Sequence, residues 1–273
     1  MIDQERLSKD GFINYIKSIW KKEIVFDYEV DGIIVDLYLP QKKLGIDLSG
    51  YFWSKDRNPK EQTKVAIKNG FRLIHIYDYE WYNFPDNFKN FLNSVINSRG
   101  KHLIRSNVVQ EISKEEFCEF LKHNHLFCDT IKGCYKMYGI YEGDELVAVS
   151  GFNKKYTKKI NWEWKRFAIK YGWMAGEQNV AELFLNEFSK EHKGVLVDYQ
   201  QIDRFIFVTD EDMGFKKESW NQGVVAINLD TLNFTRHDFI PEFGLNKQQT
   251  MEHYGFHKQV KTAGTVRWVK EIV

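Results

Sequence analysis

The sequence has little cysteine and no hydrophobic run long enough to cross a membrane. Its cysteines, Cys118, Cys128 and Cys134, form no Cys-x-x-Cys pair, which predicts free thiols in a reducing compartment and argues against a zinc site. Segments such as "LVAVSGF" are far shorter than the ~20 apolar residues of a membrane-spanning helix. The N-terminus lacks the apolar core of a signal peptide, so we expect a cytoplasmic protein.

An excess of charge of one sign is also missing. The 39 basic and 38 acidic side chains leave a formal net charge of +1, so no global field draws the chain to nucleic acid. Any such binding must come from a local basic patch. Hydrophobic residues make up 43% and charged residues 28% of the 273-residue chain, which indicates a folded protein of one large or two ordinary domains.

The first half of the chain reads as a compact α/β unit. Its predicted order is helix, three-strand meander, helix, strand and helix, and we place its end at residue 102. Ser8 is the expected first N-cap, Asp31-Gly32 is a strong hairpin signal, and Gly70 is the expected end of the second helix. The last strand is predicted over 71–81.

A linker is predicted over 98–107, and the second block, 103–273, follows it. This block opens with an amphipathic helix whose N-cap is Ser113, and it continues with a hairpin about Glu142-Gly143-Asp144. A strand, a helix and further strands come next, so the fold class is α/β (α+β) in both halves.

Two short apolar runs in the first half each contain one aspartate, Asp36 and Asp47. A carboxylate in a hydrophobic strand is costly to bury unless something pairs with it. The two strands are joined by a tight turn at Pro40-Gln41-Lys42-Lys43, so both side chains can reach a single divalent ion. Mg²⁺ (or Mn²⁺) suits such a pair, because it takes few protein carboxylates and keeps its waters. The alternative is two exposed or edge-strand aspartates.

A row of basic residues follows these strands. Lys60, Lys64, Lys68 and Arg72 fall at steps of four, so the lysines share one face of the predicted helix, with no acidic residue between them on that face. Phosphate contacts with double-stranded DNA need such a row, and an ordinary solvated helix face is the alternative.

These residues also carry a family resemblance. The segments "VDLYLPQKKLGIDLSGYFWS" and "TKVAIKNGFRLIHIYDYEW" resemble the very-short-patch-repair-like nuclease domain of phage-encoded free-standing homing endonucleases. Asp36 falls on the strand aspartate of that family and Asp47 on its glutamate. The other matching positions are Gly50, Trp53, Gly70, Leu73, Ile74, His75, Ile76, Glu80 and Trp81.

The resemblance implies a PD-(D/E)XK-superfamily fold and metal-dependent, site-specific cleavage of DNA in a phage-infected host cell. Asp36 and Asp47 would then be catalytic metal ligands. Ser54 stands at the catalytic position where the family has a histidine, and Ser49 stands where the standard motif has a lysine. Serine cannot take a proton near neutral pH as histidine does, so the alternative is a cleavage-inactive descendant that binds DNA or a host protein.

The second half resembles the C-terminal part of the same phage proteins, which looks like an N-acetyltransferase-type sheet. The matching segments are "YGIYEGDELVAVSGF", "WEWKRFAIKYGWMAGEQNVAELFLNEF" and "VLVDYQ…DEDMGF". In a true acetyltransferase, backbone amides at a glycine-rich turn before the helix hold the coenzyme A pyrophosphate. Here that turn is "GWMAGEQN", so we expect a scaffold used for binding DNA or a partner. The further alternative is a coenzyme A-dependent acyltransferase.

Overall fold

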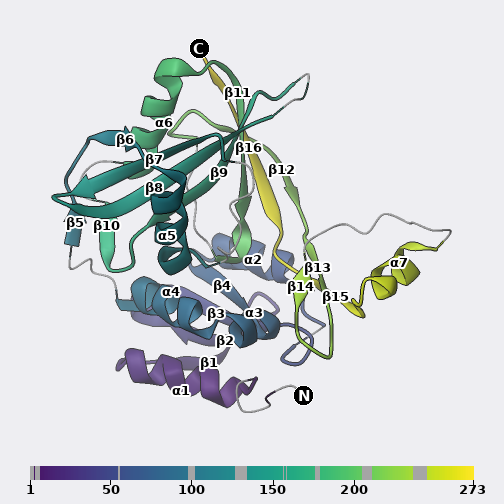
Figure 1. Ribbon diagram of the computed structural model, residues 1–273. Coiled ribbons are helices and arrows are strands. Elements are labelled where there is room, and N and C mark those ends of the chain that lie inside the picture. The colour runs from purple at the N-terminus through teal and green to yellow at the C-terminus, as the bar shows by residue number, and fades with distance from the viewer. Residues whose placement is uncertain are drawn as a thin grey trace. The chain divides into compact units, whose positions relative to one another are not determined.

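The computed structural model describes residues 3, 7–54, 56–97, 102–126, 134–155, 157, 159–175, 179–204, 211–235 and 245–273 (Figure 1). The chain divides into two compact units of mixed α/β structure. Unit 1 comprises 1–85, 201–206 and 220–265, and unit 2 comprises 86–200, 207–219 and 266–273. In the described part of the chain no helix is both long enough and apolar enough to span a membrane.

Unit 1 contains a four-stranded sheet, a three-stranded sheet and the helices around them. Its elements are α1 (Lys9–Ile19), β1 (Val25–Val30), β2 (Ile33–Leu39), η1 (Pro40–Lys42), β3 (Leu44–Ser49), α2 (Pro59–Lys68), β4 (Arg72–Tyr77), α3 (Asp78–Asn83), η2 (Ile202–Arg204), β13 (Val224–Ile227), β14 (Phe234–Thr235), α7 (Lys247–His253) and β15 (Lys258–Lys261).

Local sequence signals set the boundaries of the early elements. Ser8 caps α1, its side chain accepting from two backbone amides of the first turn. Asp31 and Gly32 both have positive φ, as a two-residue hairpin turn between β1 and β2 requires. Helix α2 ends at Lys68, and Gly70 follows with φ +71°. These three predictions are confirmed.

The first sheet has the order β1-β2-β3-β4. Strands β1, β2 and β3 form an antiparallel meander, whereas β3 and β4 run parallel with Asp47 beside His75. The parallel pair is joined through α2, as a parallel connection requires a crossover. All six residues of β3 are buried, so it is the central strand of this unit.

Unit 2 is built on a seven-stranded sheet of order β12-β16-β11-β9-β8-β7-β6. The elements assigned wholly or mainly to this unit are α4 (Pro85–Asn97), β5 (His102–Ile104), β6 (Val109–Glu111), α5 (Lys114–Asn124), β7 (Lys136–Glu142), β8 (Glu145–Lys154), β9 (Trp162–Ile169), β10 (Trp173–Ala175), α6 (Val180–Glu191), β11 (Gly194–Gln201), β12 (Lys216–Asn221) and β16 (Thr265–Ile272).

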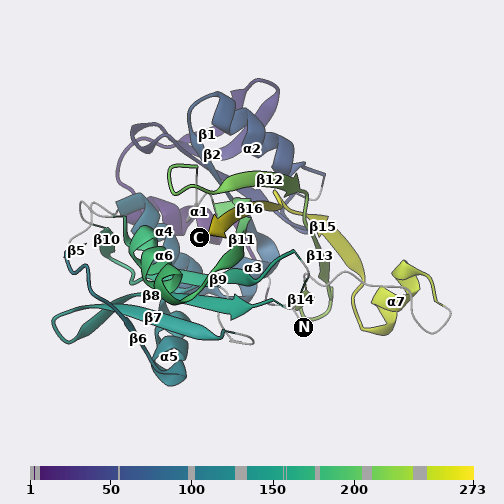
Figure 2. The ribbon, with the colours of Figure 1, turned by 90° about the horizontal axis from the view of Figure 1, so that it is seen from above.

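Helices α5 and α6 lie on opposite sides of the seven-stranded sheet (Figure 2). On one side Phe117 of α5 packs so closely on β8 that a Cβ at Gly151 would lie 2.6 Å from its ring. On the other side Phe188 of α6 stacks on Phe152 of β8, with ring centroids 4.0 Å apart. The capping box of Ser113 and the β7–β8 hairpin confirm the two local predictions for this region.

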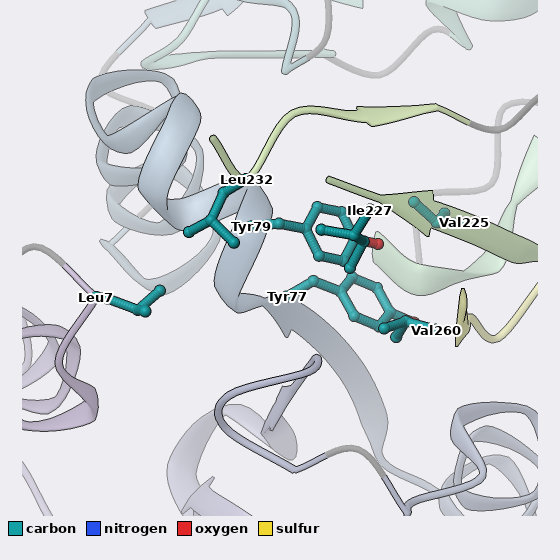
Figure 3. Close-up of a cluster of buried hydrophobic side chains, with 7 residues drawn as sticks. All are labelled: Leu7, Tyr77, Tyr79, Val225, Ile227, Leu232 and Val260. Carbon is teal, nitrogen blue, oxygen red and sulfur yellow. The ribbon is translucent and has the colours of Figure 1, made fainter. Parts of the chain in front are cut away.

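The predicted division at residue 102 differs from the division in the structure, because a late segment of the chain returns to unit 1. Strands β13, β14 and β15 form a three-stranded sheet in which β13 lies at the centre. Apolar residues of this three-stranded sheet form one buried cluster with Tyr77 at the end of β4 and Tyr79 in α3 (Figure 3). The cluster consists of Leu7, Tyr77, Tyr79, Val225, Ile227, Leu232 and Val260. Unit 1 therefore needs residues from both ends of the chain for its core.

Two boundaries predicted from the sequence are wrong. The strand predicted over 71–81 ends at Tyr77, and the next residues form α3, where Asp78 and Glu80 occupy the first turn. The predicted linker over 98–107 contains β5, which pairs in parallel with β10. A three-residue strand of this kind leaves almost no periodic signal in the sequence.

The hydroxyl of Tyr77 supports a buried hydrogen-bond network in unit 1. It donates to Asp203 Oδ1 over 2.6 Å, and the backbone N–H of Ala263 donates to the same oxygen over 2.7 Å. We expect Tyr77→Phe to lower the free energy of unfolding by about 1–3 kcal/mol, because it removes a buried donor to a carboxylate. Denaturant titration measures this change. Tyr82→Phe, which removes a partly buried hydroxyl, is the matched control, and an equal loss in both variants would contradict the assignment.

Candidate functional site

Asp36 and Asp47 lie opposite each other on β2 and β3. The ladder between these strands pairs Leu37 with Ile46, and one further step along the same register brings the two aspartates together. The Asp36 side chain also bonds to the backbone of the neighbouring strand, since its Oδ2 accepts from the N–H of Leu48 over 2.8 Å. The predicted convergence of the two carboxylates is therefore found.

A cation of the chain itself lies between the two carboxylates. Nη1 of Arg57 donates both to Asp36 Oδ2 and to Asp47 Oδ1, and Nη2 donates to Asp36 Oδ1 over 3.1 Å. Lys9 Nζ lies 3.5 Å from Asp36 Oδ1. Burial by itself lowers the pKa of Arg57, but the charges of Asp47 and Asp36 outweigh burial and raise it. Arg57 thus remains charged and links the two strands.

Asp47 is fully buried, and three side chains beside its carboxylate satisfy it. His75 Nδ1 lies 3.0 Å from Asp47 Oδ2, the hydroxyl of Ser49 donates to the same oxygen, and Gln62 Nε2 donates to Oδ1 over 3.0 Å. Burial favours the neutral acid and by itself raises the pKa of Asp47. The hydrogen bond and charge of His75, the charge of Arg57 and the hydrogen bond from Ser49 outweigh burial and hold this pKa well below its usual range. The group is therefore a buried carboxylate anion.

The imidazole of His75 is held on both sides. Its Nδ1 faces Asp47, so this nitrogen donates to the carboxylate, and its Nε2 lies 2.8 Å from Thr63 Oγ1 of α2. Thr63 Oγ1 in turn donates to the carbonyl of Pro59 over 2.8 Å. Helix α2 therefore fixes the orientation of His75, and His75 fixes that of Asp47.

One buried acceptor of the site is not satisfied. Gln62 Oε1 has no hydrogen-bond partner among the described residues, although the amide nitrogen of the same side chain donates to Asp47 and to the carbonyl of Ile34. The amide nitrogen of Gln62, and not this oxygen, faces Asp47. The carboxylates of Asp36 and Asp47 alone supply oxygen ligands of the kind that Mg²⁺ or Mn²⁺ prefers.

A turn clamped by Asp78 leads from β3 towards Arg57. Oδ2 of Asp78 accepts from the N–H groups of Phe52 and Trp53 over 2.5 and 3.1 Å, and Oδ1 accepts from Tyr79 N over 2.7 Å. A Cβ at Gly50, where φ is +125°, would lie 2.2 Å from Asp78 Oδ1, so only glycine fits there. In the described part of the chain the hydroxyl of Ser54, which closes this turn, is hydrogen-bonded to neither Asp36 nor Asp47.

The predicted basic row is not an unopposed line of charges. Lys64 pairs with Glu61 over 2.7 Å, and Lys68 pairs with Asp31 of the β1–β2 turn over 2.9 Å. The prediction of no acidic residue on this helix face is wrong, because Glu61 and Lys64 are three residues apart and therefore neighbours on the helix. Asp31 lies on another element, so the spacing of the lysines gave no indication of it.

The other members of the row are also separated from the aspartates. Lys60 Nζ donates to the carbonyl of Trp220 over 2.8 Å and lies over its ring. Arg72, at the start of β4, is three residues before His75, so strand alternation points it to the other face of the sheet. DNA contact by these residues remains a prediction.

Two groups of residues have a sequence spacing that metal ligands can have: His123 and His125 with Cys128, and His253 with His257. His123 pairs with Glu119 over 2.9 Å, and Cys128 lies outside the described residues. His125 is half-buried, and desolvation with the nearby charge of Arg166 lowers its pKa to about 4. Helix α7 ends at His253, and Gly255 follows with positive φ, so His253 and His257 do not share a helix.

In unit 2 the segment before α6 is partly described. Residues 176–178 lie outside the described residues, and Asn179 caps the helix. Its side-chain oxygen accepts from the N–H groups of Ala181 and Glu182 over 3.1 and 3.3 Å. Two amides that a phosphate group needs at a helix start are therefore already bonded. Strands β9 and β11 pair in parallel over only three positions.

Three residues of the site in unit 1 were not assigned a role from the sequence. Arg57 lies in a polar connection, Gln62 and Thr63 lie on a helix of ordinary amphipathic pattern, and none belongs to a short motif. His75 was identified only as a position matching the resembled family. One usable signal was a histidine within a buried strand, since a polar ring at such a position requires hydrogen-bond partners.

Comparison with known proteins leaves the family open. No family model and no curated protein matches the chain. Among solved structures, an acetyltransferase of Bacillus subtilis in complex with CoA is similar over 60% of this chain and 98% of that one, with 12% identity and a TM-score of 0.33. A GNAT family acetyltransferase from Elizabethkingia anophelis with acetyl-CoA bound covers 60% and 97%, with 12% identity and a TM-score of 0.25. TM-scores this low carry no argument about function, and neither protein is a nuclease.

The Asp78 clamp predicts a pH dependence of stability. Burial, opposed by the three backbone hydrogen bonds, raises the pKa of Asp78 to about 6. The unfolded carboxyl has a pKa of about 3.9. The protonated carboxyl of Asp78 therefore stabilises the fold by about 3 kcal/mol below about pH 4, and this contribution to the free energy of unfolding is lost as the pH rises through about 6. Asp47, whose pKa is lowered, loses its contribution only as the pH falls below about 4.

We therefore expect the difference in free energy of unfolding between wild type and Asp78→Asn to fall as the pH rises from 4 to 7. Denaturant titrations of both proteins at each pH measure it, and titration of histidines cancels in the difference. A difference that is constant with pH would contradict the raised pKa of Asp78.

Proposed function

We propose that unit 1 is a metal-dependent phosphodiesterase site acting on double-stranded DNA. The observation that carries this proposal is that Asp36 and Asp47, from adjacent strands, direct one carboxylate oxygen each at a single point occupied by a cationic nitrogen. A site that holds one cation between two strand carboxylates has the arrangement that a divalent ion needs. The choice of DNA rests on the resemblance to homing endonucleases and on the basic residues of α2.

In this proposal the residues of the site have two roles, to hold the ion and to orient the carboxylates. Asp36 and Asp47 would hold the ion, which when bound would activate water and neutralise charge on the phosphate. His75, fixed by Thr63, holds Asp47 in one orientation and supports its anionic form. Ser49 donates to Asp47, so it also orients the carboxylate rather than taking the role of the lysine it replaces.

Cleavage of supercoiled plasmid and phage DNA tests the proposal. We expect nicking with Mg²⁺ or Mn²⁺ by the wild type and a loss of at least about a hundredfold in Asp36→Asn and Asp47→Asn, since each removes a metal-ligand charge. Asp86→Asn, an exposed change at the start of α4, is the matched control and should cleave as the wild type does. DNA binding without cleavage under any metal would instead support the inactive, binding-only alternative.

A coenzyme A-dependent acyltransferase is the second candidate function. It is favoured by the element order of unit 2, in which a hairpin, a strand, helix α6 and the parallel strand β11 follow one another as the sequence predicted. The bonds from Ala181 and Glu182 to Asn179 oppose it, because they occupy amides at the start of α6.

We expect acetyl-coenzyme A to leave the midpoint of thermal unfolding of the full chain unchanged. Binding at a hundred times the dissociation constant would stabilise by about 2.7 kcal/mol, which differential scanning calorimetry resolves. A concentration-dependent rise in the midpoint would establish unit 2 as a coenzyme A-binding unit. Coenzyme A lacking the acyl group then separates product binding from acyl-donor binding.

A further inference from the structure

The four oxygens of the aspartate pair are all engaged, and their partners differ in kind. Asp47 Oδ2 is held by His75 and Ser49, and Asp36 Oδ1 by Lys9 and Nη2 of Arg57. The other two oxygens each accept from one fixed group, Asp36 Oδ2 from the N–H of Leu48 and Asp47 Oδ1 from Gln62 Nε2, and together they share Nη1 of Arg57. An ion that bridges the carboxylates must therefore take the position of Nη1.

Arg57 also differs from the other groups of the site in how it is held. Its side chain is 23% exposed, whereas those of Asp47 and His75 are fully buried. It belongs to the connection between the turn at 50–54 and α2, which begins after the cap Asn58. Every described hydrogen bond of its guanidinium goes to the two aspartates. A partly exposed side chain on a connecting segment can leave the site without disturbing the sheet.

We propose that Arg57 is a built-in competitor for the metal: its guanidinium balances the charge of Asp36 and Asp47 in the metal-free protein, and a divalent cation binds only by displacing it. This inference rests on the proposed function. It adds a residue that sets metal affinity without ligating the metal.

The physical reason is the cost of an uncompensated buried charge. Without any cation, two carboxylates would face each other in a buried site, and removing one partner of a buried pair costs about 3–5 kcal/mol. In the metal-free protein the guanidinium of Arg57 pairs with both carboxylates and so avoids this destabilisation. A metal ion must break these ion pairs to bind, and its net binding free energy is smaller by the free energy of breaking them. A variant without Arg57 should fold less stably on its own and bind metal more tightly.

Binding of Mn²⁺ to the full chain, followed by electron paramagnetic resonance and calorimetry, tests the inference. We expect Arg57→Ala to bind Mn²⁺ on the order of tenfold more tightly than the wild type, because no internal cation has to leave. Its midpoint of thermal unfolding should be lower without metal and should recover with saturating Mn²⁺. Millimolar guanidinium chloride should weaken Mn²⁺ binding to this variant, whereas the same concentration of sodium chloride should not. Arg57→Gln replaces Arg57→Ala if the alanine variant does not fold.

Lys9→Ala is the matched control, because it removes an equal charge near Asp36 that is not shared with Asp47. Since such a partly exposed pair is worth little, we expect a change in Mn²⁺ affinity of less than about threefold. Equal tightening in the Lys9 and Arg57 variants would overturn the inference, because it would reduce the effect to net charge.

The outcomes separate this inference from the proposed function. If wild type and Arg57→Ala bind Mn²⁺ equally and Asp47→Asn abolishes binding in both, the metal site stands and the competition is wrong. If neither protein binds Mn²⁺, the aspartates hold the arginine permanently, and both the metal site and the competition are wrong. Tighter binding in Arg57→Ala, lost again on Asp47→Asn, supports both.

Discussion

The buried charge of Asp47 is the constraint on which the rest of unit 1 depends. A carboxylate without solvent exposure in the central strand is stable only if surrounding groups replace its hydration. His75 comes from β4, Gln62 from α2 and Arg57 from the segment before α2. The parallel pairing of β3 with β4, and the crossover through α2 that it requires, place all three groups around one anion.

The same arrangement explains why the site is fully buried on one side and partly exposed on the other. The contacts of His75, Thr63 and Pro59 lie within a fully buried layer between β4 and α2, and they have one arrangement. The Arg57 side is reached by solvent and is connected to the fold through a turn that Asp78 clamps. The proposed exchange of Arg57 for a metal ion requires this combination of a buried, oriented Asp47 and a partly exposed counterion.

Local signals were enough to predict most elements of the first hundred residues. Ser8, the Asp31-Gly32 turn and Gly70 act within a few residues, so they can be identified without knowledge of the fold. The convergence of Asp36 and Asp47 followed from a short turn between two strands. The partners of these aspartates could not be predicted in the same way, because the positions of Arg57, Gln62 and Thr63 depend on how α2 packs on the sheet.

A strand was predicted where β13 lies, but its place in a three-stranded sheet of unit 1 was not, for a related reason. Its strands are short, and their apolar residues are complementary to Tyr77 and Tyr79, about 150 residues earlier in the chain, a separation that no local pattern records. Asp31, the acidic partner of Lys68, shows the same limit on a smaller scale, because it lies on another element. What the sequence shows directly is confined to neighbours along the chain.

The discontinuity of unit 1 has a consequence for the order in which the chain folds during synthesis. Tyr77 and Tyr79 leave the ribosome early, but Val225, Ile227 and Val260, which cover them, follow only after most of unit 2 has been made. At a synthesis rate of about 5–20 residues per second, the apolar surface of Tyr77 and Tyr79 stays uncovered for roughly ten seconds or more. Such contacts between distant parts of the chain also slow folding after release. The nascent protein therefore passes through a stage in which chaperone protection of β4 and α3 matters more than it does for the finished fold.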